Sequence, residues 1–140
     1  MYIVVCVKQV KNVMPTLGNK SSSEYIKNNE MFNNPFDLAA VSWAVRLKEL
    51  YAFNVVTVSM GPLSAASSVR QLFSYGVDRA LLLTNANLSG SDTYATSYSI
   101  GKLIKTILPD YDMIICGDKS LDGETGQVPY SIAAELNINS

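Results

Sequence analysis

The chain opens with YIVVCV at residues 2–7, a continuous apolar run in which most residues are β-branched. A run of this kind is typical of a β-strand that is covered on both faces. Three similar runs follow, VVTVS at 55–59, ALLLT at 80–84 and MIIC at 113–116. Strands covered on both faces occur in parallel sheets with helices on either side, so this opening already favours an α/β fold.

Helical patterns separate the four predicted strands. Apolar residues repeat at helical spacing over residues 34–50, 64–75 and 91–108, and again from about residue 127 towards the end of the chain. Gly76 is placed to end the second of these helices. The alternation predicts a doubly wound, mostly parallel, Rossmann-like sheet with right-handed crossovers. We predict the strand order 3-2-1-4, which reverses between the first and the fourth strand.

The pattern is interrupted between residues 11 and 33, where proline, glycine and a cluster of three serines occur. We expect an exposed loop or a small hairpin excursion there. Asn34 and Pro35 then begin the first helix, with Asn34 as the N-cap and Pro35 at the first helical position. Trp43 falls on the apolar face of this helix and is expected to lie in the core.

Composition limits the possible functions. The 140 residues fit a single domain, and 48% apolar against 16% charged residues indicates extensive burial. Histidine is absent, which excludes Ser-His-Asp, Cys-His and HExxH chemistry. With 11 basic and 12 acidic residues, a nucleic acid partner is not expected. The chain has no apolar stretch of the roughly 20 residues that a membrane helix needs and no signal-peptide pattern, so we expect a cytoplasmic protein without membrane insertion.

Both cysteines, Cys6 and Cys116, lie within apolar runs and are expected to be buried, reduced thiols. With the strand order 3-2-1-4 they would be neighbours near the ends of adjacent strands. Open α/β sheets bind ligands outside the carboxyl ends of the strands, where the strand order reverses. The candidate binding loops are therefore those that follow Val7, Met60 and Cys116.

The most informative loop reads GDKSLDGETGQ at residues 117–127 and leads into the last helix. Its glycines allow a ligand to approach the backbone, and the free N–H groups at the helix start suit a phosphate. A plain strand-to-helix connection with capping acids explains the same spacing. The loop matches neither GxGxxG nor GxxxxGK[ST]. Its acids, Asp118, Asp122 and Glu124, could in principle hold a metal, but capping and solvation explain them equally well, and no metal site is predicted.

A second hydroxyl-rich helix start reads GSDTYATS at residues 90–97. Ser91 or Asp92 can cap this helix, and capping alone explains most of the pattern. Three hydroxyl side chains within one turn could instead help to hold a phosphate: Thr93, Thr96 and Ser97. Tyr94 and Tyr98, at spacing i and i+4, are expected to make a packed pair rather than a flavin contact.

A series of segments carries a resemblance to a known family: IVVCVKQV (3–10), NPFDLAAVSWAVRLKE (34–49), VVTVSMGP (55–62), YGVDRALLL (75–83), GSDTYATS (90–97), IICGDKSLDGETGQV (114–128) and IAAELNI (132–138). In this order they resemble the β subunit of electron transfer flavoproteins over nearly all of the chain. The resemblance implies a nucleotide-binding α/β domain over residues 1–140, paired with an α subunit that carries the redox-active FAD. It also implies bound AMP, or a second FAD as in flavin-bifurcating members.

The resemblance further implies a binding site in the loops that the strand order selects independently. The implied cofactor-binding residues are Cys6, Asn34, Pro35, Phe36, Asp37, Met60, Asp92, Thr93, Thr96, Gly117, Ser120, Asp122, Gly123, Thr125, Gly126, Gln127 and Val128. Backbone amides at 125–127 would hold phosphate oxygens, and Cys6 and Met60 would flank the adenine. The segment at 90–97 resembles that of bifurcating members, which favours FAD over AMP.

Three features depart from the family pattern. Asp118-Lys119 stands where the family more often has Lys-Gln, and this variant resembles the branch linked to carnitine metabolism and nitrogen fixation. Pro129 stands where the family usually has glycine, which a helix accepts only in its first turn. Family members are nearly twice as long, so residues 1–140 are expected to be a domain truncated at its C-terminus.

The resemblance predicts an electron carrier subunit without catalytic residues of its own. Its expected partners are the α subunit and an acyl-CoA or other flavin dehydrogenase. The absence of histidine agrees with this, because a flavin carries the redox chemistry itself. Two alternatives stand beside it. One is a nucleotide-binding regulator of the universal-stress-protein type, expected to be a homodimer with ATP. The other is an adenylating PP-loop enzyme, whose serine- and glycine-rich loop is missing after Val7.

Overall fold

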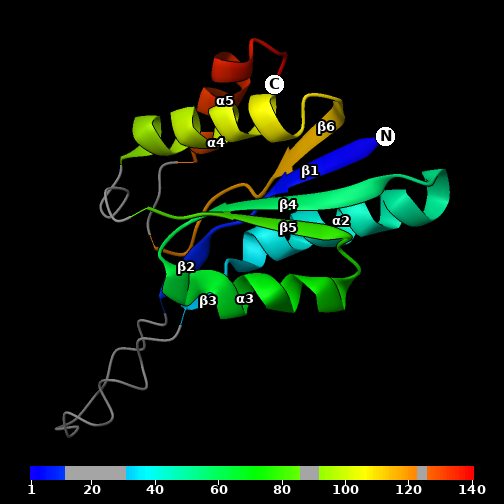
Figure 1. Cartoon of the computed structure of the whole chain (residues 1–140), viewed down its shortest axis with the longest axis horizontal. Helices are drawn as coiled ribbons and strands as arrows, with labels where there is room; N and C mark the ends of the chain where they lie inside the picture. Colours follow the sequence, from blue (N-terminus) through cyan, green and yellow to red (C-terminus); the bar gives the residue numbers. More distant parts are fainter. Residues whose placement is uncertain (12–30, 86–91, 123–125) are drawn as a thin grey trace, which may run out of the picture.

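The computed structural model describes residues 1–11, 31–85, 92–122 and 126–140. Its main sheet consists of four parallel strands: β1 (Tyr2–Cys6), β4 (Asn54–Met60), β5 (Arg79–Leu83) and β6 (Tyr111–Cys116). They lie in the order β5-β4-β1-β6 (Figure 1). By residue range this is the order predicted as 3-2-1-4, and the labels differ because two short strands after β1 take the numbers β2 and β3. The predicted α/β fold class is confirmed.

Helices cover both faces of the sheet (Figure 1). One face carries α2 (Pro35–Tyr51) and α3 (Ala66–Gln71), and the other carries α4 (Thr93–Ile107) and α5 (Val128–Leu136). The sheet is therefore doubly wound, as the alternation of strands and helices predicts.

Two apolar cores lie on the two sides of the sheet. Because strand side chains alternate between the faces, Ile3 and Val5 pack in the core under α2, whereas Val4 and Cys6 pack in the core under α4 and α5. Ile3, Val4 and Val5 are all 0% exposed. The opening run of the chain is thus covered on both faces, as its composition predicts.

The hairpin excursion begins and ends with a short antiparallel pair. Strand β2 (Gln9–Lys11) pairs with β3 (Met31–Asn33). Residues 12–30, between these strands, lie outside the described part of the chain. The antiparallel pair brings the two ends of the segment together, and the expected exposed loop or hairpin over residues 11–33 stays a prediction.

Buried amide side chains attach this base to the rest of the protein. Gln9 Nε2 donates hydrogen bonds to Asn33 Oδ1 (2.9 Å) and to Ser59 Oγ (3.1 Å). Asn33 Nδ2 donates to the backbone oxygen of Ser68 (2.7 Å). Gln9 and Asn33 are each only 4% exposed. The network therefore fixes both strands of the hairpin against β4 and α3.

The second predicted helix is less regular than its pattern suggests. Instead of one α-helix over residues 64–75, the structure has 3-10 turns η1 (Leu63–Ala65) and η2 (Leu72–Tyr75) on either side of the short α3. Short helices often tighten into 3-10 turns at their ends, because terminal groups there find i+3 partners. Gly76 ends the segment at φ 97°, as predicted.

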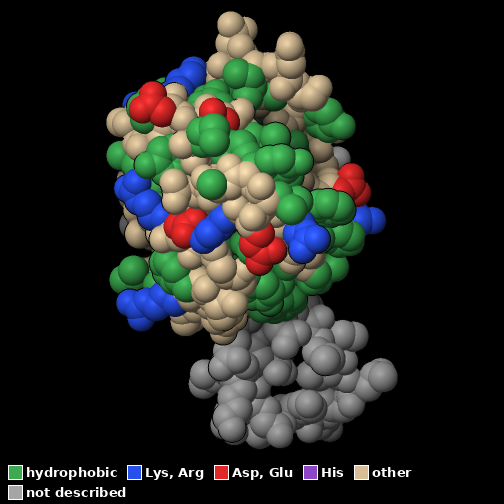
Figure 2. Space-filling model, turned by 90° about the vertical axis from the view of Figure 1, so that its right-hand side faces the viewer, with side chains coloured by type: hydrophobic (Ala, Val, Ile, Leu, Met, Phe, Trp, Pro, Cys, Tyr) green, Lys and Arg blue, Asp and Glu red, His purple; other side chains and the backbone are tan. Residues whose placement is uncertain are grey.

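The prediction that Trp43 lies in the core is wrong, because this side chain is 69% exposed. The buried face of α2 includes Ala40, Val41 and Ala44. These small side chains bring the helix close to the sheet and leave the bulky indole on the flank. On α4, Tyr94 is also exposed. Figure 2 shows hydrophobic side chains exposed among interspersed acidic and basic ones on one face of the molecule.

Strand β6 begins at Tyr111, two residues before the predicted start, and is less covered than predicted. It lies at one edge of the described sheet, and Met113 is 43% exposed there. Among the described residues, no helix is both long and apolar enough to cross a membrane.

Candidate functional site

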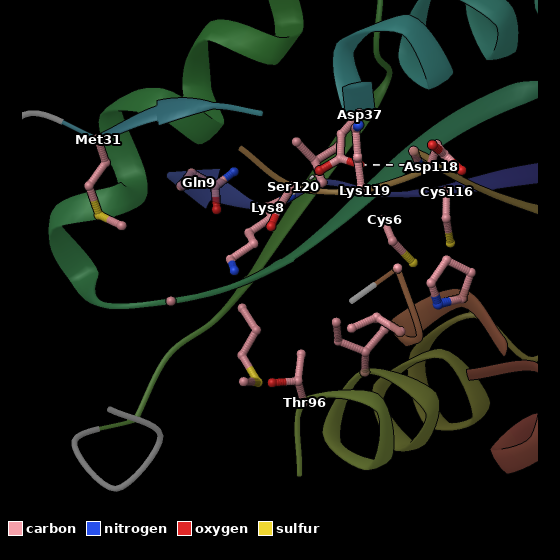
Figure 3. Close-up of a pocket in the computed structure, with 18 of the residues that line it drawn as sticks. Cys6, Lys8, Gln9, Met31, Asp37, Thr96, Cys116, Asp118, Lys119 and Ser120 are labelled. Atoms are coloured by element: carbon pink, nitrogen blue, oxygen red, sulfur yellow. Dashed lines mark hydrogen bonds between the residues drawn. The ribbon is translucent and has the colours of Figure 1, made fainter. Parts of the chain in front are cut away.

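A pocket of about 260 Å³ opens at the carboxyl ends of the strands, at the reversal of strand order between β1 and β6. It lies where the fold predicts a ligand site. Figure 3 shows it between the strand ends and helix α4. Its lining residues are Cys6, Val7, Lys8, Gln9, Met31, Asp37, Met60, Gly61, Pro62, Thr96, Ile100, Cys116, Gly117, Asp118, Lys119, Ser120, Gly126, Val128 and Pro129.

Asp37 joins the two loops on either side of this reversal. Its carboxylate accepts a hydrogen bond from the backbone N–H of Lys8 (2.8 Å), after β1, and from that of Gly117 (3.1 Å), after β6. A Cβ atom on Gly117 would overlap the Asp37 carboxylate, so this close approach requires glycine. Burial raises the pKa of Asp37 above its usual value, and the hydrogen bonds from Lys8, Asn34 and Gly117 oppose that rise.

Asn34 is fully buried and supports the loop after β6. Its Nδ2 donates to the backbone oxygen of Lys119 (2.8 Å), and its Oδ1 accepts from the N–H of Leu121 (3.3 Å). Asn34 occupies the N-cap position of α2, as predicted, but its side chain makes no capping hydrogen bond. The predicted N-cap position is thus correct, but the predicted capping by the side chain is wrong, because the side chain bonds to the loop instead.

The ammonium of Lys119 lies 5.3 Å from the centre of the Phe36 ring.

One ion pair, between Lys8 and Asp122, ties this loop to the end of β1. Lys8 Nζ lies 3.0 Å from Asp122 Oδ1, and Ser120 Oγ donates to the same oxygen at 2.5 Å. Partial burial alone would raise the pKa of Asp122, but the hydrogen bonds from Ser120 and Lys8 outweigh it and hold the pKa below its usual value. Asp122 therefore organises the loop and stays ionised at neutral pH.

The two thiols lie next to each other at the ends of their strands. Cys6 and Cys116 occupy paired positions of β1 and β6, and both are free. Their predicted proximity is confirmed. Cys6 is buried and Cys116 is partly buried, and both line the pocket (Figure 3).

The start of α5 forms part of the pocket wall. Val128 and Pro129 line it, and Pro129 falls in the first turn of the helix, where a missing N–H is tolerated. Gly126 adopts a φ of 69° just before the helix. The first N–H groups of a helix have no partner within it, so this end of α5 suits an anion.

The start of α4 contributes less than its hydroxyl groups suggest. Asp92 caps the helix by accepting from the N–H of Ala95 (2.8 Å), as predicted. The Ser97 hydroxyl donates to the backbone oxygen of Thr93 (2.7 Å) and is therefore engaged within the helix. Only Thr96 of the three hydroxyl side chains lines the pocket.

The structure brings together about half of the predicted site residues. Those that line the pocket are Cys6, Asp37, Met60, Thr96, Gly117, Ser120, Gly126 and Val128. Those outside the lining are Asn34, Pro35, Phe36, Asp92, Thr93, Asp122 and Gln127. Gly123 and Thr125 lie outside the described residues.

Sequence reasoning missed Gln9 and Met31, which the hairpin brings to the pocket. The position of Gln9, a polar residue just after the first strand, could have indicated a site residue. Its hydrogen-bond partners, Asn33 and Ser59, are distant in the sequence and could not be predicted. Gln9 Oε1 is one of the buried side-chain oxygens without a hydrogen-bond partner among the described residues. Within the same residues, no group of three His, Cys, Asp or Glu side chains could hold a metal ion.

Known proteins resemble this chain along nearly its whole length. A family model for the electron transfer flavoprotein domain matches residues 25–140. Protein FixA of Azotobacter vinelandii is 35% identical over 140 residues, which cover 98% of this chain and 50% of that protein. Electron transfer flavoprotein subunit beta of Megasphaera elsdenii is 37% identical over 146 residues, covering 99% and 54%.

A third relative is named for the reaction that it serves. Acryloyl-CoA reductase electron transfer subunit gamma of Anaerotignum propionicum is 37% identical over 147 residues, covering 99% of this chain and 52% of that protein. The chain spans about half the length of the curated relatives it matches.

Proposed function

Because the chain belongs to the electron transfer flavoprotein domain family, we propose that it acts as a β-type subunit whose pocket binds AMP or FAD. The observation that carries this proposal is the position of the pocket. The pocket lies where the strand order reverses, and residues of β1, β4, β6 and α5 line it.

The lining suits the two chemically different parts of a nucleotide. The start of α5 offers backbone N–H groups for phosphate oxygens. The sulfur-containing side chains of Cys6 and Met60 offer an apolar surface for a flat base. Lys8 is paired with Asp122, so the helix amides are the donors that we expect to meet the phosphate first. In the bifurcating form of the family, FAD would take the place of AMP.

The electron transfer role needs no proton-transfer group from this chain. FAD supplies the redox chemistry when it is bound, on the partner α subunit and in this pocket if a second one binds there. The residues of this chain position the nucleotide and exclude water from it. We propose that electrons pass from an acyl-CoA or other flavin dehydrogenase to an acceptor through the α subunit's flavin. An electron transfer role is supported by the Anaerotignum propionicum relative, which is named as an electron transfer subunit of an acryloyl-CoA reductase.

Calorimetry with AMP, adenosine and FAD tests the proposal on the full natural protein, alone and with its α subunit. We expect AMP to bind at least about tenfold more tightly than adenosine, because the phosphate gains charge-assisted hydrogen bonds. Val128→Pro removes one N–H at the first position of α5 and also strains Gln127, whose backbone is helical just before it. This variant should lower the affinity for AMP by a larger factor than the affinity for adenosine.

Two results would contradict the proposal. One is that the protein binds neither AMP nor FAD and does not associate with an α subunit. The other is a homodimer that binds ATP more tightly than either nucleotide, which would indicate a regulator of the universal-stress-protein type.

A further inference from the structure

Cys6 and Cys116 have a geometry that permits a covalent bond between them. They occupy paired positions on neighbouring parallel strands, so both side chains point to the same face of the sheet. Neighbouring strands lie about 4.8 Å apart, and disulfides join Cα atoms about 4.4–6.8 Å apart. The Cβ atoms of such a pair must approach slightly, so the bond would carry some strain and be easily reduced.

An oxidant can reach these thiols through the pocket. Both residues line it, although Cys6 is only 8% exposed. Figure 3 shows the two sulfur atoms next to each other and pointing the same way. The core side chains next to them on β1 and β6, Val4 and Ile114, are apolar and carry no thiol.

The environment also gives the two thiols different reactivity. The hydrogen bond between the thiols lowers the pKa of Cys116 below its usual value, while burial and the charge of Asp37 oppose this effect. The same hydrogen bond, together with burial, raises the pKa of Cys6. Cys116 is therefore the thiol that more readily becomes a thiolate, and the thiolate is the form that attacks oxidants.

We propose that Cys6 and Cys116 form a reversible dithiol–disulfide couple in the pocket, oxidised by two-electron oxidants of the peroxide or disulfide class. With hydrogen peroxide, the Cys116 thiolate attacks one peroxide oxygen and becomes a sulfenic acid as the O–O bond breaks, and the leaving hydroxide takes up a proton to become the first water. Cys6 then attacks that sulfur, the S–S bond forms, and the second water leaves. The two thiols lose two electrons and two protons in total. A dithiol reductant reverses the change by exchange.

The couple also gives the proposed nucleotide site a chemical reporter. This step rests on the proposed function: a base that lies against Cys6 would cover both sulfur atoms. A bound nucleotide should therefore slow the oxidation, and the disulfide should in turn alter nucleotide affinity, because binding and oxidation are linked.

The main test is peptide mapping by mass spectrometry on the full natural protein. The reduced protein is treated with hydrogen peroxide or diamide, digested without reductant, and compared with a sample treated afterwards with dithiothreitol. We expect a linked pair of peptides containing Cys6 and Cys116 that the reductant separates. In the Cys6→Ser and Cys116→Ser controls, the remaining thiol should give only single oxidation products. Separate oxidation of both cysteines in the unaltered protein, without a linked pair, would overturn the proposal.

A second measurement addresses the thiol pair even if the bond forms slowly. Iodoacetamide alkylation of Cys116 is followed against pH in the unaltered protein, in Cys6→Ala and in Cys6→Ser. Losing the donor in Cys6→Ala should move the alkylation profile to higher pH, and the serine hydroxyl should restore part of the shift. Coincident profiles would show that the thiols do not interact and would count against the couple.

Adding AMP or FAD to the oxidation separates this inference from the proposed function. A linked pair that forms at least about tenfold more slowly with saturating nucleotide supports both. A linked pair that forms equally fast supports the couple and contradicts the placement of the nucleotide. Retained nucleotide binding without a linked pair overturns the couple alone.

Discussion

Replacing Asn34 with alanine should loosen the loop after β6 and measurably destabilise the protein. The side chain is fully buried and holds the backbone oxygen of Lys119 and the N–H of Leu121. Each group left without a partner costs about 1–3 kcal/mol. Lys119 and Leu121 are themselves exposed, so water can partly replace the amide, and we expect the lower end, about 2–3 kcal/mol in total.

Urea unfolding followed by circular dichroism measures this loss directly. At about 3 °C per kcal/mol for a domain of this size, the melting temperature should fall by about 6–9 °C. Asn34→Asp keeps the acceptor for Leu121 but places an oxygen against the Lys119 carbonyl, so it should be destabilised as well. The matched control is Ser42→Ala on the exposed side of the same helix, whose hydroxyl bonds only to its own helix at Leu38. We expect this control to stay within about 0.5 kcal/mol of the unaltered protein.

The comparison of these variants can refute the reasoning. If Asn34→Ala lost no more stability than Ser42→Ala, the buried amide would not be supporting the loop. The same conclusion would follow if Asn34→Asp matched the unaltered protein.

Three further changes test other parts of the structure. Gly117→Ala should lower the free energy of unfolding by about 2–3 kcal/mol, because the new methyl group overlaps the Asp37 carboxylate. Gly61→Ala is the control: its methyl group makes an ordinary 3.7 Å contact with Ala65, so urea unfolding should show little change. Asp78 has a pKa below its usual 3.8, because hydrogen bonds from Lys48 and from backbone outweigh its partial burial. The ionised Asp78 therefore stabilises the fold above its usual pKa, and this stabilisation is lost as the pH falls through the lowered pKa. In Asp78→Asn, the urea midpoint should fall less steeply than in the unaltered protein as the pH is lowered from about 5. Asp92→Ala removes the N-cap of α4 and should lower the free energy of unfolding by about 1 kcal/mol. The melting temperature measures this loss, and an unchanged value would contradict the capping role.

Local patterns were enough to predict the main elements of the fold. The β-branched run at residues 2–7 predicted a strand covered on both faces, since residue type and burial agree there. Gly76 and Asp92 act at helix ends through their own backbone or side chain. Such signals need no knowledge of distant residues. The predicted strand order 3-2-1-4 is the usual one for a doubly wound sheet of this kind, and it placed Cys6 beside Cys116.

Long-range contacts in the site could not be predicted in the same way. Asn34 bonds to residues 85 and 87 positions away, and a pattern in its own segment indicates only an N-cap. Gln9 reaches the pocket because a hairpin pairs it with Asn33, and its partners could not be read from the residues around it. Trp43 was placed in the core by spacing alone, but alanines at the helix–sheet contact set how closely α2 approaches. These outcomes depend on side chains from two or three elements at once.

The buried amides of Gln9 and Asn33 also let the segment between β2 and β3 change in sequence without changing the sheet. Gln9 and Asn33 hold the two ends of this segment together through their own contacts with β4 and α3. Because these contacts come from the two ends of the segment, insertions or deletions between residues 11 and 31 should have little effect on the pocket. A single substitution at Gln9 or Asn33, by contrast, should disturb it.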